Sequence, residues 1–288
     1  MPHVARITLR PVRGLDGVAV TAARVLASGA LDQDRRWRLV DAEGRCVDGP
    51  GGAPLHRVRA TFDLAAREVE LALRPWAGRG LAEGSFPLLP GPDGPCPWLS
   101  EALGRRVFLE ERPDGGFPDD ADAPGPTVAA TASLERVAEW FGLHLDDVRR
   151  RLMIGLEIEG CDAFWEDSLV APAPALPLPG LAAVAGLVAD PWGERPPPVP
   201  LKFLAGTARY AAVAVRALDA GAARDPENGL EHEGFREIFE AWRRRRMRRD
   251  VDPAAWDGLF RLGATTVGDG LGGEVAVGDR LSPAAHPV

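Results

Sequence analysis

The chain has 288 residues, a formal net charge of −8 at pH 7 and a sequence pI near 5.3, and 45% of its residues are hydrophobic. This composition is ordinary for a soluble globular protein, and the length allows one large domain or two medium ones. Three cysteines without a CxxC pair argue against a disulfide scaffold and a zinc site, and the acidic balance argues against a nucleic-acid partner. No uncharged apolar run approaches about eighteen residues and no apolar segment follows the N-terminus, so we expect a cytoplasmic protein without membrane span or signal peptide.

Arginine alone is a weak marker of function in this sequence. Lys202 is the single lysine among 34 basic residues, and the chain also has 33 glycines and 27 prolines. This bias is typical of GC-rich coding. An arginine therefore needs further support before it counts as a site residue.

The N-terminal part of the chain alternates apolar and polar residues between turns of Gly, Pro and Asp, which predicts short antiparallel strands. The expected strands lie near residues 4–9, 18–20, 23–26, 36–40, 58–62 and 69–73. Short strands at this spacing are typical of an antiparallel sheet or barrel.

The remainder of the chain predicts a mixture of helices and strands. Apolar residues at helical spacing predict helices at 96–103, at 134–141 with Ser133 as N-cap, at 145–151 and at 234–249. Alternation predicts strands at 152–159, 211–215 and 274–277. Residues 113–127 are expected to form a loop that can border a site, and the proline-rich residues 171–200 to form turns flanking short strands.

The helix expected at 234–249 ends in a dense group of arginines. They are Arg243, Arg244, Arg245, Arg246, Arg248 and Arg249. Favourable charge at a helix C-terminus on a solvated face is one interpretation, and a contact surface for an acidic partner is the other.

Familiar catalytic motifs are absent. The sequence has no GxGxxG after a strand, no GxxxxGK[ST], no HExxH and no GxSxG, and no nucleophile–base pair follows from spacing. The histidines are isolated from one another: His3, His56, His144, His232 and His286. Without a family resemblance the residues therefore indicate a β-rich protein of unknown function.

Several stretches spread over the chain form a recognisable pattern when they are taken in order. They are residues 7–15 with Gly17, 34–41, 131–134, 159–162, 166–168 and 273–279. In this order they resemble the MOSC superfamily, the β-barrel proteins related to the C-terminal domain of molybdenum cofactor sulfurase. The resemblance implies a β-rich α+β fold, a MOSC-like β-barrel with an N-terminal β-barrel-type subdomain and a few peripheral helices. It implies a MOSC N-terminal domain at 1–112 and a MOSC-like domain at 113–288.

The resemblance also implies a molybdopterin-bound molybdenum held by a cysteine thiolate, or a persulfide carried on that cysteine. The matching stretch is 208–217, and Tyr210 occupies the cysteine position. A phenol cannot carry a persulfide, and the family's Asp-Pro is replaced by Arg216 and Ala217. We therefore expect no cofactor and no bound metal. The alternative keeps the molybdenum cofactor, with Cys46 or Cys161 reaching the metal.

Other family positions also differ, while two basic residues persist. Where the family has Lys-Ser, this chain has Arg13 and Gly14, and residues 152–155 correspond to the family's Phe-Arg-Pro-Asn. A glycine-rich turn replaces the family's arginine near Pro54. Arg35 persists at a position that in the family helps to hold the pterin phosphate. A buried pair of Arg35 with Asp34 or Glu166 is the other interpretation, and Cys161 is also explained as a small buried residue.

These observations lead to the hypothesis of a repurposed family member that binds a small organic substrate in the former cofactor cleft. We expect a non-redox reaction of specialised metabolism, such as a cyclisation, isomerisation or elimination. The candidate catalytic residues are Tyr210, Asp162 and Glu166, with Asp167 as a further acid or base. Tyr210 suits the role of hydrogen-bond donor or general acid if a neighbour such as Arg209 or Arg216 lowers its pKa. The candidate substrate-binding residues are Arg13, Arg35, Arg209 and Trp165.

Two alternatives remain open. One is a molybdenum-cofactor-dependent oxidoreductase or sulfur carrier. The other is a non-catalytic binding or scaffold protein that contacts an acidic protein through the arginine run at 243–249. Four tryptophans are candidates for lining the cleft, or for ordinary core packing: Trp140, Trp165, Trp192 and Trp242.

Overall fold

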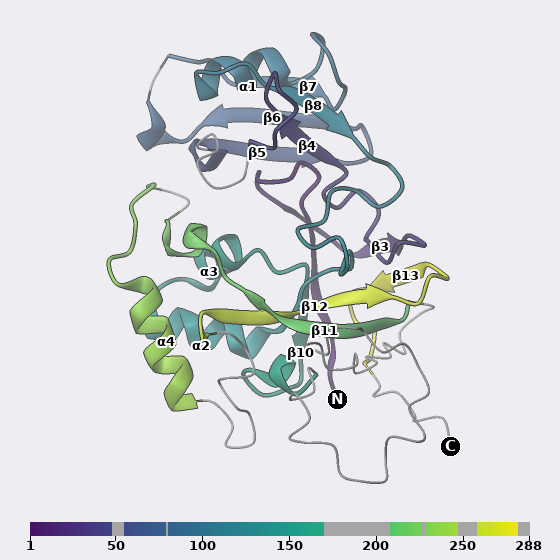
Figure 1. The fold of residues 1–288 in the computed structure, drawn as a ribbon, viewed down its shortest axis with the longest axis vertical. Helices are drawn as coiled ribbons and strands as arrows, with labels where there is room; N and C mark the ends of the chain where they lie inside the picture. The colour runs from purple at the N-terminus through teal and green to yellow at the C-terminus, as the bar shows by residue number, and fades with distance from the viewer. Residues whose placement is uncertain (48–54, 79, 170–207, 226–227, 247–257, 282–288) are drawn as a thin grey trace.

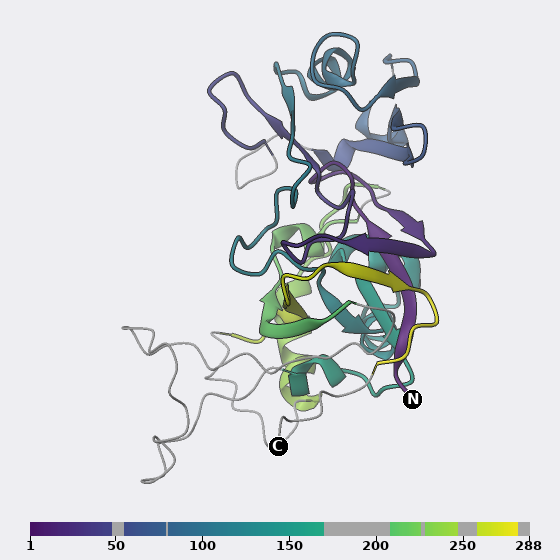
Figure 2. The ribbon, with the colours of Figure 1, turned by 90° about the vertical axis from the view of Figure 1, so that its right-hand side faces the viewer.

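The computed structural model describes residues 1–47, 55–78, 80–169, 208–225, 228–246 and 258–281. Two lobes follow one another along the long axis of the molecule (Figures 1 and 2). We call residues 37–111 the small lobe, and the remaining described strands and helices the large lobe.

The small lobe contains two small antiparallel sheets and one helix. Strands β5, β6 and β7 form a meander, and β4 pairs with β8. Along β5 the side chains of Val58, Ala60 and Phe62 alternate inward, as a half-buried strand requires. The elements are β4 (Trp37–Val40), η1 (Leu55–Arg57), β5 (Val58–Asp63), β6 (Glu68–Leu73), η2 (Pro75–Ala77), β7 (Gly84–Pro87), α1 (Cys96–Leu103) and β8 (Phe108–Glu111).

The large lobe is built on a six-stranded sheet with the order β11-β12-β9-β10-β1-β2, beside a two-stranded sheet of β13 and β3. Strand β1 is antiparallel to β10, whereas β9 and β10 are parallel. The strands are β1 (His3–Leu9), β2 (Val18–Val20), β3 (Ala22–Val25), β9 (Val128–Ala130), β10 (Leu156–Glu159), β11 (Tyr210–Ala217), β12 (Arg261–Gly268) and β13 (Gly273–Ala276).

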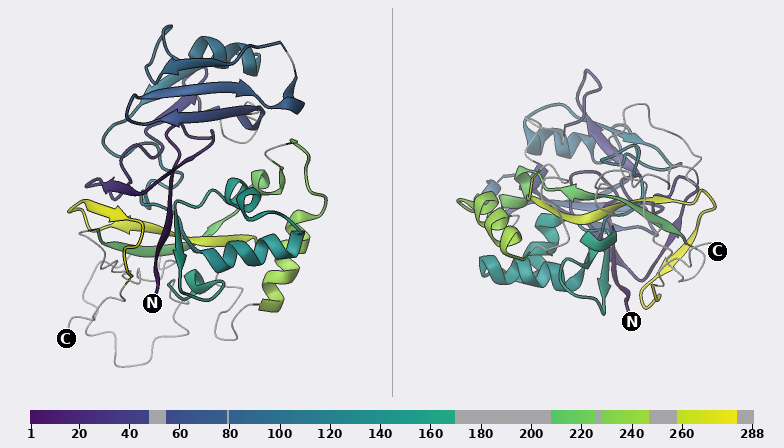
Figure 3. Two further views of the ribbon diagram at one scale, coloured as in Figure 1. Left: turned by 180° about the vertical axis from the view of Figure 1, so that it is seen from behind. Right: turned by 60° about the horizontal axis from the view of Figure 1, so that its bottom comes forward.

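Helices flank this sheet on one side of the large lobe (Figure 3). Trp140 of α2 stacks on Trp242 of α4 with ring centroids 6.1 Å apart, and this contact joins the two helices. The elements are α2 (Thr131–Phe141), α3 (Leu145–Leu152), η3 (Trp165–Leu169), η4 (Ala220–Ala223) and α4 (Phe235–Arg246). Ordinary core packing therefore explains these two tryptophans, and Trp192 lies outside the described residues.

The expected β-rich α+β class with a few peripheral helices is confirmed, and the described strands form open sheets. The predicted helices correspond to α1, α2, α3 and the described part of α4. Ser133 as N-cap is wrong, because α2 begins at Thr131 and the buried Ser133 hydroxyl donates to Glu166. Where a strand was expected at 152–159, the observed strand β10 begins only at Leu156, and Leu152 is the last residue of α3. Strands β7, β8, β9 and β12 were not predicted, and residues 171–200 lie outside the described range.

The N-terminal strands belong to the large lobe even though they precede the small lobe in sequence. Strand β1 pairs with β10, and β3 pairs with β13. The chain therefore passes through the large lobe, builds the small lobe and returns. The division at residue 112 stays a prediction.

The arginine run on α4 is divided between the interior and the surface. Arg243 is fully buried and forms a bidentate ion pair with Asp167, at 2.8 and 2.9 Å. The prediction that Arg243 belongs to a contact surface for an acidic partner is therefore wrong. The carboxylate of Asp167 is the counterion of this buried guanidinium. Arg244, Arg245 and Arg246 are exposed, and their partner role stays a prediction. In the described ranges, no helix is long and apolar enough to cross a bilayer.

Asp167→Asn should destabilise the fold by about 3–5 kcal/mol, because it removes the charged, bidentate partner of the buried Arg243 guanidinium. Urea unfolding of the variant measures this loss. Arg244→Gln on the exposed side of the same helix is the matched control, with a change within about 0.5 kcal/mol. Equal stability of D167N and the wild type would contradict the assignment.

Candidate functional site

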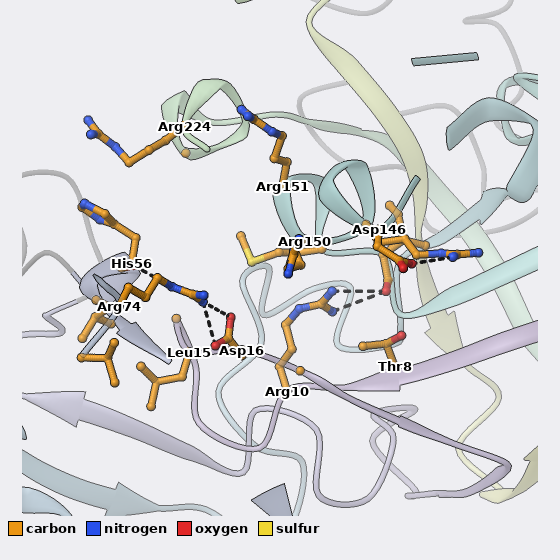
Figure 4. Close-up of a pocket in the computed structure, with 18 of the residues that line it drawn as sticks. Thr8, Arg10, Leu15, Asp16, His56, Arg74, Asp146, Arg150, Arg151 and Arg224 are labelled. Atoms are coloured by element: carbon orange, nitrogen blue, oxygen red, sulfur yellow. Dashed lines mark hydrogen bonds and ion pairs between the residues drawn. The ribbon is translucent and has the colours of Figure 1, made fainter. Parts of the chain in front are cut away.

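A cavity of about 480 Å³ lies where the two lobes meet. Figure 4 shows side chains of both lobes around it, with His56 and Arg74 facing Arg150 and Arg151 of α3. Its lining includes Arg6, Thr8, Arg10, Leu15, Asp16, Leu55, His56, Val58, Arg74, Asp146, Arg149, Arg150, Arg151, Met153, Ile154, Glu157 and Arg224, with three glycines. We call it the arginine cavity.

The lining carries an excess of positive charge. Seven of its residues are arginines, and three are carboxylates, Asp16, Asp146 and Glu157. Two further carboxylates next to the lining, Asp147 and Asp225, pair with Arg150 and Arg151. The whole chain has a net charge of −8, so this positive charge is local. A concave site of this size with converging cations is suited to a small anion.

Helix α3 provides the large-lobe wall. Its buried Val148 and Leu152 fix the apolar face, and its last turn places three consecutive arginines, 149–151, at the cavity. Arg149 contacts Glu157 at 2.8 Å, and Arg151 donates to the carbonyl of Ala223 at 2.9 Å. These contacts hold the guanidinium groups in place, so they need little reorganisation to meet an anion.

The small-lobe wall depends on one ion pair. The guanidinium of the buried Arg74 contacts both carboxylate oxygens of Asp16, at 2.6 and 2.8 Å, and donates to the carbonyl of His56 at 3.1 Å. Asp16 lies between β1 and β2, whereas Arg74 follows β6. The pair thus connects two distant parts of the sequence at the edge of the cavity.

Two cavity arginines have no carboxylate partner within the described part of the chain. Arg10 donates from both terminal nitrogens to the carbonyl of Ile154 at 3.4 Å, and Arg224 donates to that of Gly229 at 2.8 Å. Burial, together with repulsion from Arg216 and Arg35, lowers the pKa of Arg10 to about 10, against the attraction of Asp34 and Asp119. Arg10 therefore remains charged at neutral pH, and a bound anion would compensate its charge.

Two predicted binding residues, Arg13 and Arg35, lie in a cluster beside Arg10. Arg35 contacts Asp34 at 2.8 Å and Asp119 at 3.5 Å, and Arg13 contacts Asp119 at 3.1 Å. The alternative of an Arg35–Asp34 pair is thus confirmed, and the partner is not Glu166. Neither arginine lines the arginine cavity, and their predicted substrate contacts stay predictions.

Tyr210 is a core residue at the start of β11, only 3% exposed. Burial raises its pKa far above the ordinary value, and the charges of Asp34 and Asp269 raise it further. The condition that Arg209 or Arg216 lowers this pKa is therefore not met. Tyr210 and Arg35 both interact with Asp34, which places them in one region, but Tyr210 does not line the cavity.

The other predicted residues lie on or near η3 and the start of β11. Glu166 is fully buried and accepts hydrogen bonds from the Ala130 amide at 3.2 Å and the Ser133 hydroxyl at 2.9 Å. Trp165 packs against the hydrophobic cluster that contains Tyr210. Asp162 and Arg209 are exposed. None of these side chains lines the arginine cavity, so their predicted roles stay predictions.

The cysteines do not supply a thiolate to the arginine cavity. All three belong to the described residues, and none lines it. The sulfur of Cys46 lies 3.8 Å from Arg13 Nη1, and burial raises the pKa of Cys161 to about 12. Among the described residues, no group of three His, Cys, Asp or Glu side chains is arranged to hold a metal ion. The donors present at this cavity therefore do not fit a thiolate-bound molybdenum.

Most residues that line the cavity carry no sequence motif that marks them as site residues. His56 was one of five isolated histidines, and the arginines 149–151 were discounted because arginine is abundant. The available signal was three consecutive arginines in the last turn of a predicted helix. Their approach to His56 and Arg74 depends on the packing of the lobes.

A comparison with protein families gives one match, at the N-terminus. Residues 1–75 match the family described as the MOSC N-terminal beta barrel domain. This match supports membership of the MOSC superfamily. No curated protein matches the chain. The MOSC N-terminal match contains Arg10, Asp16, His56 and Arg74, and therefore one whole side of the arginine cavity.

The buried carboxyl of Glu166 predicts a pH dependence of stability. Burial, and secondarily the charge of Asp167, raises its pKa from 4.5 to about 7. The folded state then binds a proton more tightly than the unfolded state, so stability falls as the pH rises from 4.5 to about 7. Glu166→Gln should remove this decline, which amounts to about 3 kcal/mol.

Urea unfolding over this pH range measures the effect, with Glu135→Gln on the exposed side of α2 as the control. The control should follow the wild-type profile. Parallel pH profiles for E166Q and the wild type would show that Glu166 does not bind this proton.

Proposed function

We propose that this MOSC-family protein binds a small organic anion in the arginine cavity and acts on it as a non-redox enzyme. The observation that carries the proposal is the convergence of seven arginines from both lobes on one cavity. Its volume of about 480 Å³ is in the range of small-molecule sites. Elements such as β1 and α3 contribute to its lining, together with residues outside helices and strands such as Asp16 and Arg224.

The arrangement of the arginines supports a ligand with more than one negative charge. Arg10 and Arg224 reach the cavity from two distant segments of the large lobe. Among the described residues, the side chains of both donate hydrogen bonds only to main-chain carbonyls. Arg150 of α3 is exposed, lines the same cavity and pairs with Asp147. Guanidinium groups bind carboxylates and phosphates through paired hydrogen bonds, so carboxylates and phosphate esters are the ligand classes that fit.

The same arginines support chemistry in which negative charge develops on the substrate. Fixed guanidinium groups stabilise an enolate or carboxylate oxygen in the transition state without reorganising. Isomerisation, elimination and cyclisation through proton transfer all require that such negative charge be stabilised in the transition state. We therefore place the proposed activity in the cytoplasm and in specialised metabolism, with a small organic acid or phosphate ester as substrate.

We propose that no molybdenum cofactor takes part. In the family the cofactor chemistry depends on a cysteine sulfur, and this chain has Tyr210 at the matching position. The phenol is buried in an apolar cluster and keeps its proton, so it offers no soft ligand. The organic anion is the ligand to which the cavity residues are suited.

The protein should bind ethane-1,2-disulfonate, an organic dianion that stays ionised at all relevant pH values, and the affinity should fall with added salt. Arg150→Gln and Arg224→Gln should each weaken binding by about tenfold to a hundredfold, because each removes one charged hydrogen bond of about 1.5–3 kcal/mol. Titration calorimetry measures the affinities. The matched control is Arg136→Gln, which removes a charge from α2 outside the cavity and should leave the affinity unchanged.

If both cavity variants bound the disulfonate as tightly as the wild type and the Arg136→Gln control do, the anion would bind elsewhere and the proposal would be contradicted. A thermal-shift screen of small carboxylic acids and phosphate esters on the wild type then ranks substrate candidates. Compounds whose shift is lost in both cavity variants qualify for activity assays.

A further inference from the structure

His56 is the one imidazole among the residues that line the arginine cavity in the described structure. It lies in η1, is half-buried, and its ring stacks on Trp76 with centroids 5.4 Å apart and an interplanar angle of 13°. Its carbonyl accepts a hydrogen bond from Arg74. Both the ring plane and the backbone of His56 are therefore fixed at the cavity wall (Figure 4).

A second contact brings a large-lobe arginine to this imidazole. Gly229 approaches the ring of Trp76 so closely that a Cβ atom on it would lie 2.6 Å from the ring. The carbonyl of Gly229 accepts the hydrogen bond from Arg224, at 2.8 Å. The sequence of contacts from His56 through Trp76 and Gly229 thus sets the position of Arg224.

The charges around His56 are mainly positive. Arg57 follows it in η1, Arg74 comes from the end of β6, and Arg224 comes from the segment after η4. The carboxylate of Asp16, which lines the same cavity, is paired with Arg74. Burial, together with Arg224, Arg57 and Arg74, lowers the pKa of His56 below its ordinary value of 6.5. The free protein therefore holds a neutral imidazole near neutral pH.

We propose that His56 takes up one proton when an anion binds in the arginine cavity, and that the resulting imidazolium is the proton donor to the bound anion. This inference rests on the proposed function. The proton comes from the solvent and forms an N–H bond on the imidazole. No electrons are transferred, and a later proton transfer to the substrate returns the neutral ring.

The coupling follows from the charges. An anion among Arg74 and Arg224 offsets the repulsion that these cations exert on an imidazolium, so the pKa of His56 rises on binding. By linkage, the anion binds more tightly as the pH falls through the interval between the free and the bound pKa of His56. The affinity gain is about tenfold for each unit of pKa increase.

An NMR pH titration of the full chain with isotope-labelled histidine tests this inference. It is performed in sodium chloride and in ethane-1,2-disulfonate at equal ionic strength, and His56→Gln assigns the His56 signal. The fixed charge of the disulfonate means that every proton taken up binds to the protein. We expect the pKa of His56 to rise by about one unit or more in the disulfonate while that of the exposed His144 stays constant.

Calorimetry in two buffers with different ionisation heats counts the same proton. H56Q should bind the disulfonate without proton uptake and with a pH-independent affinity, whereas the control His144→Gln should behave as the wild type. Arginine-dependent binding with an unchanged pKa of His56 would overturn this inference and leave the proposed anion site in place. Absence of saturable binding would overturn the proposed function and this inference with it.

Discussion

Positive charge enclosed between the two lobes is the constraint on which the site depends. Arg74 and Arg151 are almost fully buried, and removing such groups from water costs several kcal/mol unless each finds a partner. The partners are Asp16 for Arg74, and the carbonyl of Ala223 with the carboxylate of Asp225 for Arg151. Each of these contacts joins segments distant in the sequence, so the same charges that define the cavity also fix its walls.

The compensation is incomplete, and this is the basis of the proposed affinity of the cavity for anions. Arg10 and Arg224 have only main-chain carbonyls as hydrogen-bond acceptors in the described residues, and a carbonyl dipole offsets less charge than a carboxylate. An anionic ligand completes the balance. The stacking of His56 on Trp76 places a titratable group inside the same field, so the charge of the ligand and the protonation of the imidazole are coupled.

The family resemblance directs attention to Tyr210 and Arg35, and the structure relates this region to the cavity through Arg10. Arg35 pairs with Asp34, and Asp34 also contacts the main chain of Arg10 by accepting from its amide at 2.8 Å. The cluster of Arg35, Asp34 and Asp119 therefore lies behind the cavity wall. Tyr210 belongs to the core, where its phenol keeps its proton.

Much of the fold could be predicted from local pattern, because a helical or alternating period depends on residues near one another. Helix α3 and strand β5 are examples, since Leu145–Leu152 and Val58–Asp63 display their periods without interruption. Strand β12 escaped prediction because its glycines and threonines, such as Gly263 and Thr266, hide the apolar alternation.

The candidate site could not be predicted in the same way. Its lining extends from Arg6 to Arg224, and it exists only because the small lobe packs against α3 and η4. Ser133 illustrates the same limit on a smaller scale. Its position before an apolar helix favours an N-cap, but the burial of Glu166 decides where its hydroxyl points.

We propose that the chain binds a small organic anion in the arginine cavity and lacks the sulfur ligand on which the cofactor chemistry of the MOSC family depends. The most direct test of this proposal is the molybdenum and pterin content of the protein purified from a host that makes the cofactor. Metal analysis and pterin fluorescence on the same sample should find neither above trace level. Near-stoichiometric molybdenum with pterin would contradict the account and would require one of Cys46, Cys96 and Cys161 to reach the metal.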